Sequence, residues 1–130
     1  MKLLLDTHVF IWWIFDDRRL PVPMRALLSN ARHALYLSVV SGWEIAIKVG
    51  TGKLKLPHNV ERFVSEQMKM NGIEALPIQM SHALHVVTLP ALHHDPFDRL
   101  LVSQSKLEKL SLVTADSQIA RYGVNVVWKE

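Results

Sequence analysis

The sequence predicts an α/β fold, with a mostly parallel β-sheet covered by helices on both faces. Two observations lead to this class. Short apolar runs of strand length alternate along the chain with segments whose apolar residues have helical spacing. Such alternation is typical of parallel strands joined by helical crossovers. The chain has 130 residues, of which 49% are hydrophobic, about the size of one domain around a single core. We therefore expect one domain over residues 1–130.

Five short segments are predicted as strands. The first is Lys2-Leu3-Leu4-Leu5, an apolar run that ends at Asp6. The third carries Pro77 near its end, where a strand tolerates a missing N–H group. The full set comprises residues 2–5, 35–39, 73–78, 110–114 and 124–128.

Helices are predicted between these strands, and several have recognisable ends. Pro21-Val22-Pro23 marks a helix start, and Ser41 is a candidate N-cap. Gly50-Thr51-Gly52 is a helix stop, because glycine readily takes a left-handed conformation, and Asn71-Gly72 stops the next helix. The predicted helices are residues 7–15, 21–31, 41–49, 60–70, 81–88, 96–109 and 117–122.

Charge and composition indicate which partners and which cellular compartment to expect for the protein. Fifteen Lys and Arg against 12 Asp and Glu give a formal net charge of +3, which permits a polyanionic partner without demanding one. Cysteine is absent, as in many proteins of reducing compartments. The apolar stretch at residues 9–15 is far shorter than the roughly 20 residues that span a bilayer. It ends in Asp16-Asp17-Arg18-Arg19 and not in a signal-cleavage site. We expect a cytoplasmic protein with no membrane partner.

Four carboxylates stand where strands end or helices begin. Asp6, Glu44 and Asp116 each follow an apolar run, and Asp98 lies in the Pro-marked helix start Asp95-Pro96-Phe97-Asp98. Because the carboxyl ends of parallel strands share one edge of the sheet, these acids are expected to meet in one pocket. Such a pocket suits a hard cation with oxygen ligands.

Helix capping is the alternative explanation of the same acids. Ser41-Gly42-Trp43-Glu44 matches the capping box, in which a Glu at the third helical position bonds back to the cap. Asp95 and Asp98 follow the same logic, and Asp6 and Asp116 could each stabilise a helix start by about 0.3–1 kcal/mol through the dipole. Each acid alone is open to either explanation. Carboxylates at all four places favour a cation, because Ser, Thr and Asn cap equally well and neighbouring carboxylates repel each other.

Four motifs follow one another along the chain in a fixed order. They are Leu5-Asp6-Thr7-His8, the segment 38–48 (Ser-Val-Val-Ser-Gly-Trp-Glu-Ile-Ala-Ile-Lys), Asp95-Pro96-Phe97-Asp98-Arg99-Leu100-Leu101 and Thr114-Ala115-Asp116. Together they resemble the PIN domain, and within it the VapC-type toxins of toxin–antitoxin pairs. The resemblance implies a three-layer α/β/α sandwich on a mostly parallel sheet of about five short strands. It also implies an acidic pocket for Mg²⁺ or Mn²⁺ and an endoribonuclease activity restrained by a partner antitoxin.

The resemblance places the family's catalytic and metal-binding acids at Asp6, Glu44, Asp98 and Asp116. Mg²⁺ usually takes one or two direct carboxylates and keeps several waters. We therefore expect Asp6 and Asp98 to be the most direct ligands, with Glu44 and Asp116 acting through water or holding a second ion. A metal-activated water would then hydrolyse an RNA phosphodiester bond.

Three hydroxyl residues, Thr7, Ser38 and Thr114, are candidates for supporting roles. All three stand at predicted strand ends. A hydroxyl in such a place can orient a carboxylate or a metal-bound water, or it can cap a helix or tie a turn. Both explanations remain open at the level of the sequence.

Two basic residues are further supporting candidates. Lys48 lies one helical turn after Glu44 and can form an ordinary i,i+4 ion pair or contact a substrate phosphate. Arg99 follows Asp98 directly and is expected to pair with a nearby acid, with phosphate binding as the alternative.

Other functional classes fit the residues less well. A phosphatase of the haloacid dehalogenase type would need a second Asp two residues after Asp6, where this chain has His8. A catalytically silent PIN-type module that binds RNA or protein would normally have lost some of the acids, and all four are present. Gly50-Thr51-Gly52-Lys53 is similar to a phosphate loop but lacks the first Gly and the Ser/Thr of that pattern. We interpret it as a helix stop.

A protein partner is expected from the family resemblance and from the apolar side chains. Trp12 and Trp13 lie in an apolar helix and are expected to fill the core or a dimer interface. An apolar surface around them and the helices that start near Pro23 and Val60 would serve a homodimer and an antitoxin segment. We expect the antitoxin to block the pocket by presenting a basic side chain to the acids.

Overall fold

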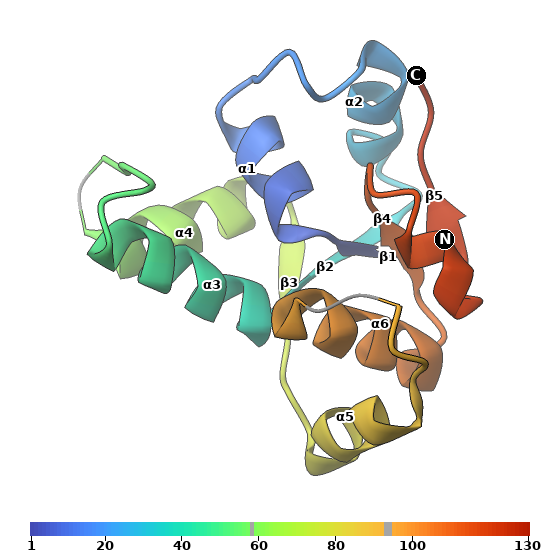
Figure 1. The fold of residues 1–130 in the computed structure, drawn as a ribbon. Helices are drawn as coiled ribbons and strands as arrows, with labels where there is room; N and C mark the ends of the chain where they lie inside the picture. Colours follow the sequence, from blue (N-terminus) through green and yellow to red (C-terminus); the bar gives the residue numbers. More distant parts are fainter. Residues whose placement is uncertain (58, 93–94) are drawn as a thin grey trace.

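The chain folds into a five-stranded parallel sheet with helices on both faces (Figure 1). The structure is a computed structural model that describes residues 1–57, 59–92 and 95–130. All neighbouring strands pair in parallel, in the order β3-β2-β1-β4-β5. This confirms the predicted α/β class. The strands are β1 (Lys2–Leu5), β2 (Ala34–Ser38), β3 (Ile73–Leu76), β4 (Ser111–Val113) and β5 (Val126–Val127).

Most helices lie close to their predicted positions, although α2 ends at Leu28, before the predicted end at residue 31. The segment predicted as one helix at 81–88 is divided into an α-helix and a 3₁₀ turn, and the predicted helix at 117–122 is only a 3₁₀ turn. In the described part of the chain no helix is both long enough and apolar enough to cross a bilayer. The elements are α1 (Thr7–Ile14), α2 (Val22–Leu28), α3 (Val39–Gly50), α4 (Val60–Met70), α5 (Met80–His85), η1 (Val86–Thr88), α6 (Pro96–Glu108) and η2 (Ile119–Tyr122).

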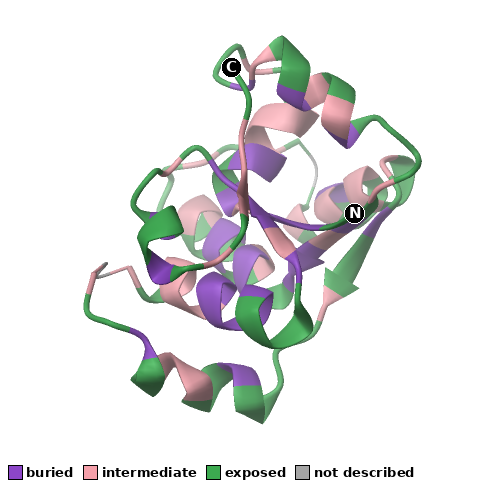
Figure 2. Ribbon diagram, turned by 90° about the vertical axis from the view of Figure 1, so that its right-hand side faces the viewer, coloured by how far each residue is buried: buried purple, intermediate pink, exposed green. Residues whose placement is uncertain are grey.

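The sheet is buried on both faces, which explains the continuous apolar runs of its strands. Leu3 and Leu5 of β1 belong to one buried cluster, and Leu4 between them belongs to another, as the alternation of a strand requires. Buried residues of α1 and α2 and half-buried residues of α4 pack in the first cluster, and α6 and η2 contribute to the second. Figure 2 shows the buried residues concentrated in the sheet and on the inner sides of the helices.

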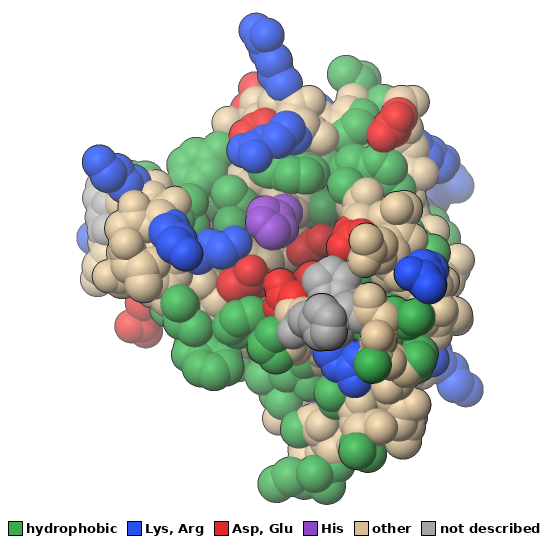
Figure 3. Space-filling model, viewed as in Figure 1, with side chains coloured by type: hydrophobic (Ala, Val, Ile, Leu, Met, Phe, Trp, Pro, Cys, Tyr) green, Lys and Arg blue, Asp and Glu red, His purple; other side chains and the backbone are tan. Residues whose placement is uncertain are grey.

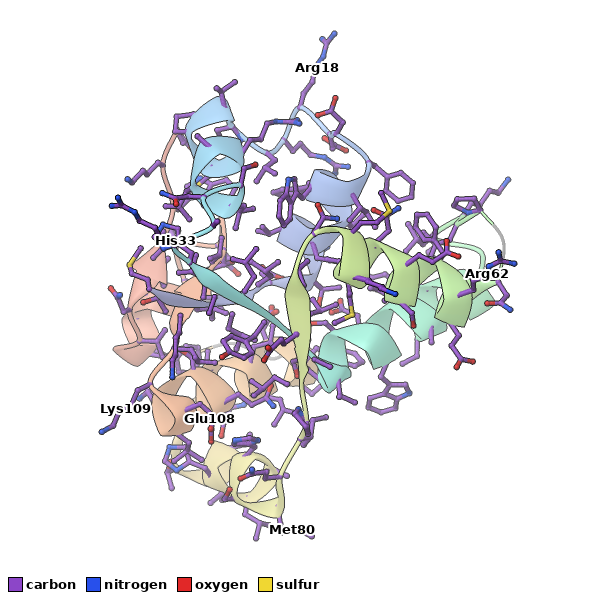
Figure 4. All side chains as sticks on the ribbon, turned by 180° about the vertical axis from the view of Figure 1, so that it is seen from behind. Arg18, His33, Arg62, Met80, Glu108 and Lys109 are labelled. Carbon is purple, nitrogen blue, oxygen red and sulfur yellow. The ribbon has the colours of Figure 1, made fainter. Side chains whose placement is uncertain are left out.

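Helix α5 packs on α6 and not directly on the sheet. Its His82 is fully buried, with Nδ1 accepting from the Gln79 N–H at 3.0 Å and Nε2 lying 3.0 Å from a carboxylate oxygen of Glu108. Figure 4 shows Glu108 at the end of α6 on the side of α5, and Met80 at the outer end of α5. His82 therefore attaches α5 to the rest of the domain.

The strand order places a topological switch point beside β1. From the central strand β1 the chain passes first to β2 on one side and later to β4 on the other. In open parallel sheets, such a point leaves a crevice at the carboxyl ends of the strands, where ligands bind. Asp6 follows β1 at this point, and its backbone N–H donates to the Val113 carbonyl of β4 at 2.9 Å.

The N-cap of helix α3 lies three residues earlier than predicted, which removes one explanation of Glu44. Strand β2 ends at Ser38, whose hydroxyl caps α3 by accepting from the Val40 N–H at 3.1 Å. The prediction that Ser41 is the cap and that Val39 ends the strand is therefore wrong. Val39 and Val40 are β-branched, which favours a strand locally. In the structure, however, Val40 belongs to helix α3 and is buried in the second cluster. Glu44 lies in the second turn of α3, where it cannot close a capping box.

Replacing Ser38 by alanine tests the observed start of α3. Loss of the cap is expected to lower the free energy of unfolding by about 1 kcal/mol, measured by urea denaturation. Ser65→Ala, at an exposed position in the interior of α4, is the control and should change it by less than about 0.5 kcal/mol. Equal stability of the two variants would contradict the assignment.

Candidate active site

Asp6 occupies the centre of the candidate site. It follows β1 and is the N-cap of α1, with one carboxylate oxygen accepting from the His8 N–H at 3.3 Å. The other oxygen accepts a hydrogen bond from the Thr114 hydroxyl at 2.7 Å. Only 13% of its side chain is exposed. Asp6 is therefore a cap, as the alternative explanation required, but it is also a buried carboxylate held by two segments far apart in the sequence.

The environment of Asp6 disfavours its charged form. Burial raises the pKa of the Asp6 carboxyl above its ordinary value, and the nearby charge of Glu44 raises this pKa further. The hydrogen bond from Thr114 and the proximity of His8 act in the opposite direction without cancelling the effect of burial. An ionised Asp6 beside Glu44 therefore costs folding free energy, and a cation at this position would recover it.

Glu44 and Lys48 form an ion pair that extends to His8. Glu44 is buried in α3, and its carboxylate lies 3.2 Å from the Lys48 ammonium one turn later. The ammonium also lies 3.4 Å from Nε2 of His8, and Nδ1 of the same ring is 3.9 Å from Asp6 Oδ1. The predicted i,i+4 pair is present, and through His8 it connects the two carboxylates.

Thr114 joins Asp6 to the segment that carries Asp116. Besides donating to Asp6, the Thr114 hydroxyl accepts from the Asp116 N–H at 3.1 Å. Asp116 Oδ1 in turn accepts from the Gln118 N–H at 2.9 Å. The structure thus has Thr114 orienting a carboxylate, one of the two roles considered for it. Asp6 and Asp116 line one recess of about 350 Å³ together with His8, Trp12, Arg19 and Ala115.

Asp98 lies in the first turn of α6, on a helix that packs against α3. Asp95 caps this helix through the N–H groups of Phe97 at 2.8 Å and Asp98 at 3.4 Å, which places Asp98 in the first turn as predicted. The start of α6 packs against α3, where the Phe97 ring meets the Trp43 ring edge-on with centroids 5.4 Å apart. Asp98 and Glu44, which follow these two aromatic residues, are thereby held on adjoining helices.

The acidic side chains gather on one face of the molecule. Figure 3 shows Asp and Glu side chains in one cluster near the middle of this face, with a His and a Lys or Arg side chain beside it. In the described stretches, no three His, Asp or Glu side chains stand in a ready-made metal-binding arrangement. The donors are carboxylate oxygens, which Mg²⁺ and Mn²⁺ prefer, and buried Asp6 is repelled by Glu44. By their chemistry these residues fit a hard divalent cation.

The remaining predicted residues have structural contacts. The Thr7 hydroxyl donates to the Ser41 hydroxyl at 2.8 Å, and both residues are buried, so that this pair ties α1 to α3 beneath the acids. The Arg99 guanidinium donates to the carbonyls of Pro90, Val86 and Leu89 and to the Tyr122 hydroxyl. These contacts give Arg99 a structural place between η1 and η2, and its expected pairing with an acid stays a prediction.

Sequence reasoning missed two side chains of the site, His8 and Arg19. In the sequence His8 stands in the Leu5-Asp6-Thr7-His8 motif and in place of a second Asp, without a role of its own, yet its ring lies between Asp6 and Lys48. Arg19 packs over the Trp12 ring at 5.2 Å and lines the recess of Asp6. His8 is only two residues from Asp6 in the sequence, and this proximity pointed to a place in the site. No pattern in the sequence near Arg19 indicates that its side chain packs on Trp12 of α1.

Comparisons with known proteins agree with this fold. The family model described as "PIN domain" matches residues 3–125. Among curated relatives, Ribonuclease VapC22 of Mycobacterium tuberculosis is 27% identical over 90% of this chain and 88% of its own. Ribonuclease VapC16 of the same organism is 34% identical over 47% of this chain, a match that spans only 43% of VapC16.

Solved structures give the same fold at low sequence identity. VapBC2 from Rickettsia felis, bound to a promoter DNA fragment, matches with a TM-score of 0.74 and 16% identity, covering 98% of both chains. DNA-bound VapBC from Salmonella typhimurium matches with a TM-score of 0.68 and 20% identity, covering 98% of this chain and 97% of its own. The family match over nearly the whole length confirms the resemblance seen in the sequence: this chain belongs to the PIN domain family.

Proposed function

We propose that this PIN domain is a metal-dependent endoribonuclease, the toxin of a toxin–antitoxin pair. The observation that carries the proposal is the buried Asp6 carboxylate beside Glu44 at the switch point of the sheet. A charge that costs folding free energy at a ligand-binding edge is typical of functional sites. The names of the curated relatives, Ribonuclease VapC22 and Ribonuclease VapC16, supply the substrate class.

The metal in this proposal is Mg²⁺ or Mn²⁺, held by the four acids. Asp6 and Asp98 are its direct ligands, and Glu44 and Asp116 act through water or with a second ion. When bound, the metal supplies an activated water and neutralises the charge that develops around phosphorus. The Thr114 hydroxyl positions the Asp6 carboxylate for this purpose. Lys48 balances the charge of Glu44.

The partner in this proposal is an antitoxin, with a second copy of the chain as a further partner. The solved relatives from Rickettsia felis and Salmonella typhimurium are both VapBC assemblies on DNA. Trp12 and Trp13 are half-buried against the first core cluster, so part of each ring is left accessible to a partner. Large apolar residues more than 60% exposed are Val22, Trp43, Met70, Met80, Leu84 and Val87.

A silent RNA-binding or protein-binding module is the second candidate. It would share the fold and the family but would gain no stability from a metal. The phosphatase alternative is disfavoured because His8, and not a second Asp, stands two residues after Asp6. Cleavage and metal binding separate these candidates.

RNA cleavage by purified, antitoxin-free protein tests the proposed activity. With Mn²⁺ and total cellular RNA, Asp6→Asn and Asp98→Asn are each expected to lower the cleavage rate by about 100-fold or more, because a metal ligand is lost. Glu66→Gln is the matched control, since Glu66 pairs with Arg62 at 2.9 Å on the surface of α4, and its rate should equal that of the unaltered protein. Cleavage that persists in Asp6→Asn would assign the activity to another site or to a contaminant.

Thermal melting tests the electrostatic cost of Asp6. In EDTA at neutral pH, Asp6→Asn is expected to melt at a higher temperature than the unaltered protein. A carboxyl whose pKa is raised by folding destabilises the folded state once the pH exceeds its unfolded pKa. Mn²⁺ should raise the melting temperature of the unaltered protein and of Glu66→Gln but not that of Asp6→Asn. A silent module would show no metal-dependent shift in any of the three.

Co-expression with the product of the neighbouring open reading frame tests the toxin assignment. A small protein encoded there is expected to co-purify with this chain and to suppress its RNA cleavage. Its basic side chains, replaced by alanine one at a time, should identify the residue that faces the acids. If no neighbouring product binds the chain, the ribonuclease proposal can stand but the toxin–antitoxin proposal cannot.

A further inference from the structure

A second recess adjoins the acids on the side of α3 and α6. Its volume is about 440 Å³, within the range of roughly 300–1,000 Å³ that is usual for small-ligand sites. Glu44 belongs to its lining, so it borders directly on the candidate active site. The lining residues are Glu44, Ile47, Lys48, Thr51, Lys53, Asp95, Pro96 and Phe97.

The turn after α3 brings a second lysine to this recess. The N–H groups of Lys53 and Leu54 both donate to the Lys48 carbonyl, at 2.9 and 3.1 Å, and Gly52 between them and the helix has a φ of +76°, which only glycine adopts without strain. The chain therefore folds back over the last turn of α3. The helix stop predicted from the sequence is present, and it also places Lys53 beside Lys48.

The two lysines differ in the charge that they leave available. Lys48 is paired with Glu44 at 3.2 Å, and its side chain is only 27% exposed. Lys53 is exposed and takes no part in the ion pairs found among the described residues. An anion that enters this recess would therefore meet the charge of Lys53 first.

The recess also has an apolar part of its lining, which includes an aromatic residue. This part is formed by Ile47, Pro96 and Phe97. The Phe97 ring is supported from the side by Trp43, at 5.4 Å between centroids and 66° between planes. In Figure 3, Lys and Arg side chains and hydrophobic side chains meet to the left of the acidic cluster. Basic and aromatic side chains in the lining of one recess match the two halves of a nucleotide, its phosphate and its base.

We propose that this recess is a nucleotide subsite for the RNA strand that is cut at the acids. Lys53 binds a phosphate next to the scissile one, and the neighbouring base packs on Phe97. A base can reach this ring only when it is unstacked, so the subsite selects single-stranded RNA. The inference rests on the proposed ribonuclease function, and it adds a binding residue, Lys53, that makes no contact with the acids.

The salt dependence of RNA binding tests the role of Lys53. The probe is a fluorescein-labelled 12-nucleotide oligoadenylate, titrated by anisotropy with Ca²⁺ in place of Mg²⁺ to limit cleavage. Lys53→Met is expected to weaken binding about three- to tenfold and to reduce the slope of log K against log salt concentration by about 0.7, the value for one phosphate contact on a single strand. Lys55→Met, an equally exposed lysine two residues on that does not line the recess, should leave both quantities unchanged. Equal effects of the two variants would overturn the proposal.

A Phe97→Leu variant tests the aromatic part of the lining independently. It should weaken oligoadenylate binding about five- to tenfold with an unchanged salt slope, because stacking involves no counterion release.

In Mn²⁺-dependent cleavage, Lys53→Met should raise KM and leave kcat and the Mn²⁺-dependent melting shift unaltered. Cleavage with an unchanged KM in Lys53→Met overturns the subsite and leaves the ribonuclease function standing. RNA binding that follows these predictions without any cleavage overturns the ribonuclease function and leaves the subsite standing.

Discussion

The site depends on the burial of one carboxylate at the centre of the sheet. Asp6 follows β1, which has a strand on each side, and its backbone is hydrogen-bonded to β4 through the Val113 carbonyl. Most of the side chain is therefore shielded from water whether or not it is charged, and Glu44 adds repulsion. The Thr114 hydroxyl, His8 and the Lys48–Glu44 pair offset part of this cost. The ionised Asp6 carboxylate thus lowers the stability of the fold at the place where we propose that a cation binds, as is common at functional sites.

The other acids are positioned by different local structures. Asp98 lies in a capped first turn, whereas Glu44 lies in the second turn of a helix capped by Ser38. Asp116 lies in a turn, and its backbone N–H donates to the Thr114 hydroxyl. Capping thus explains the position of some acids and not of others, and no single backbone motif accounts for all four. Asp6 and Asp116 line one recess and Glu44 lines another, and a common ligand of all four acids is what we propose.

The sequence predicted those features that depend on local patterns. The five apolar runs, the Asp95-Pro96 helix start and the Gly50-Thr51-Gly52 stop each carry their signal within a few residues, and all appear in the structure. The start of α3 was misjudged, because Val39 and Val40 favour a strand locally while the second core cluster holds Val40 on a helix. The carbonyl partners of Arg99 and the bridge from His8 to Lys48 depend on residues brought together by the fold. Such contacts have no local signature.

The most direct test of the central claim is a crystal structure of the protein grown with Mn²⁺, with the ion located by its anomalous scattering. The account predicts a Mn²⁺ ion with oxygen atoms of both Asp6 and Asp98 at about 2.1–2.2 Å. Glu44 and Asp116 should lie around the same ion or a second one. An ion bound away from Asp6, or an Asp6 carboxylate that keeps only its contacts with Thr114 and His8 in saturating Mn²⁺, would contradict it.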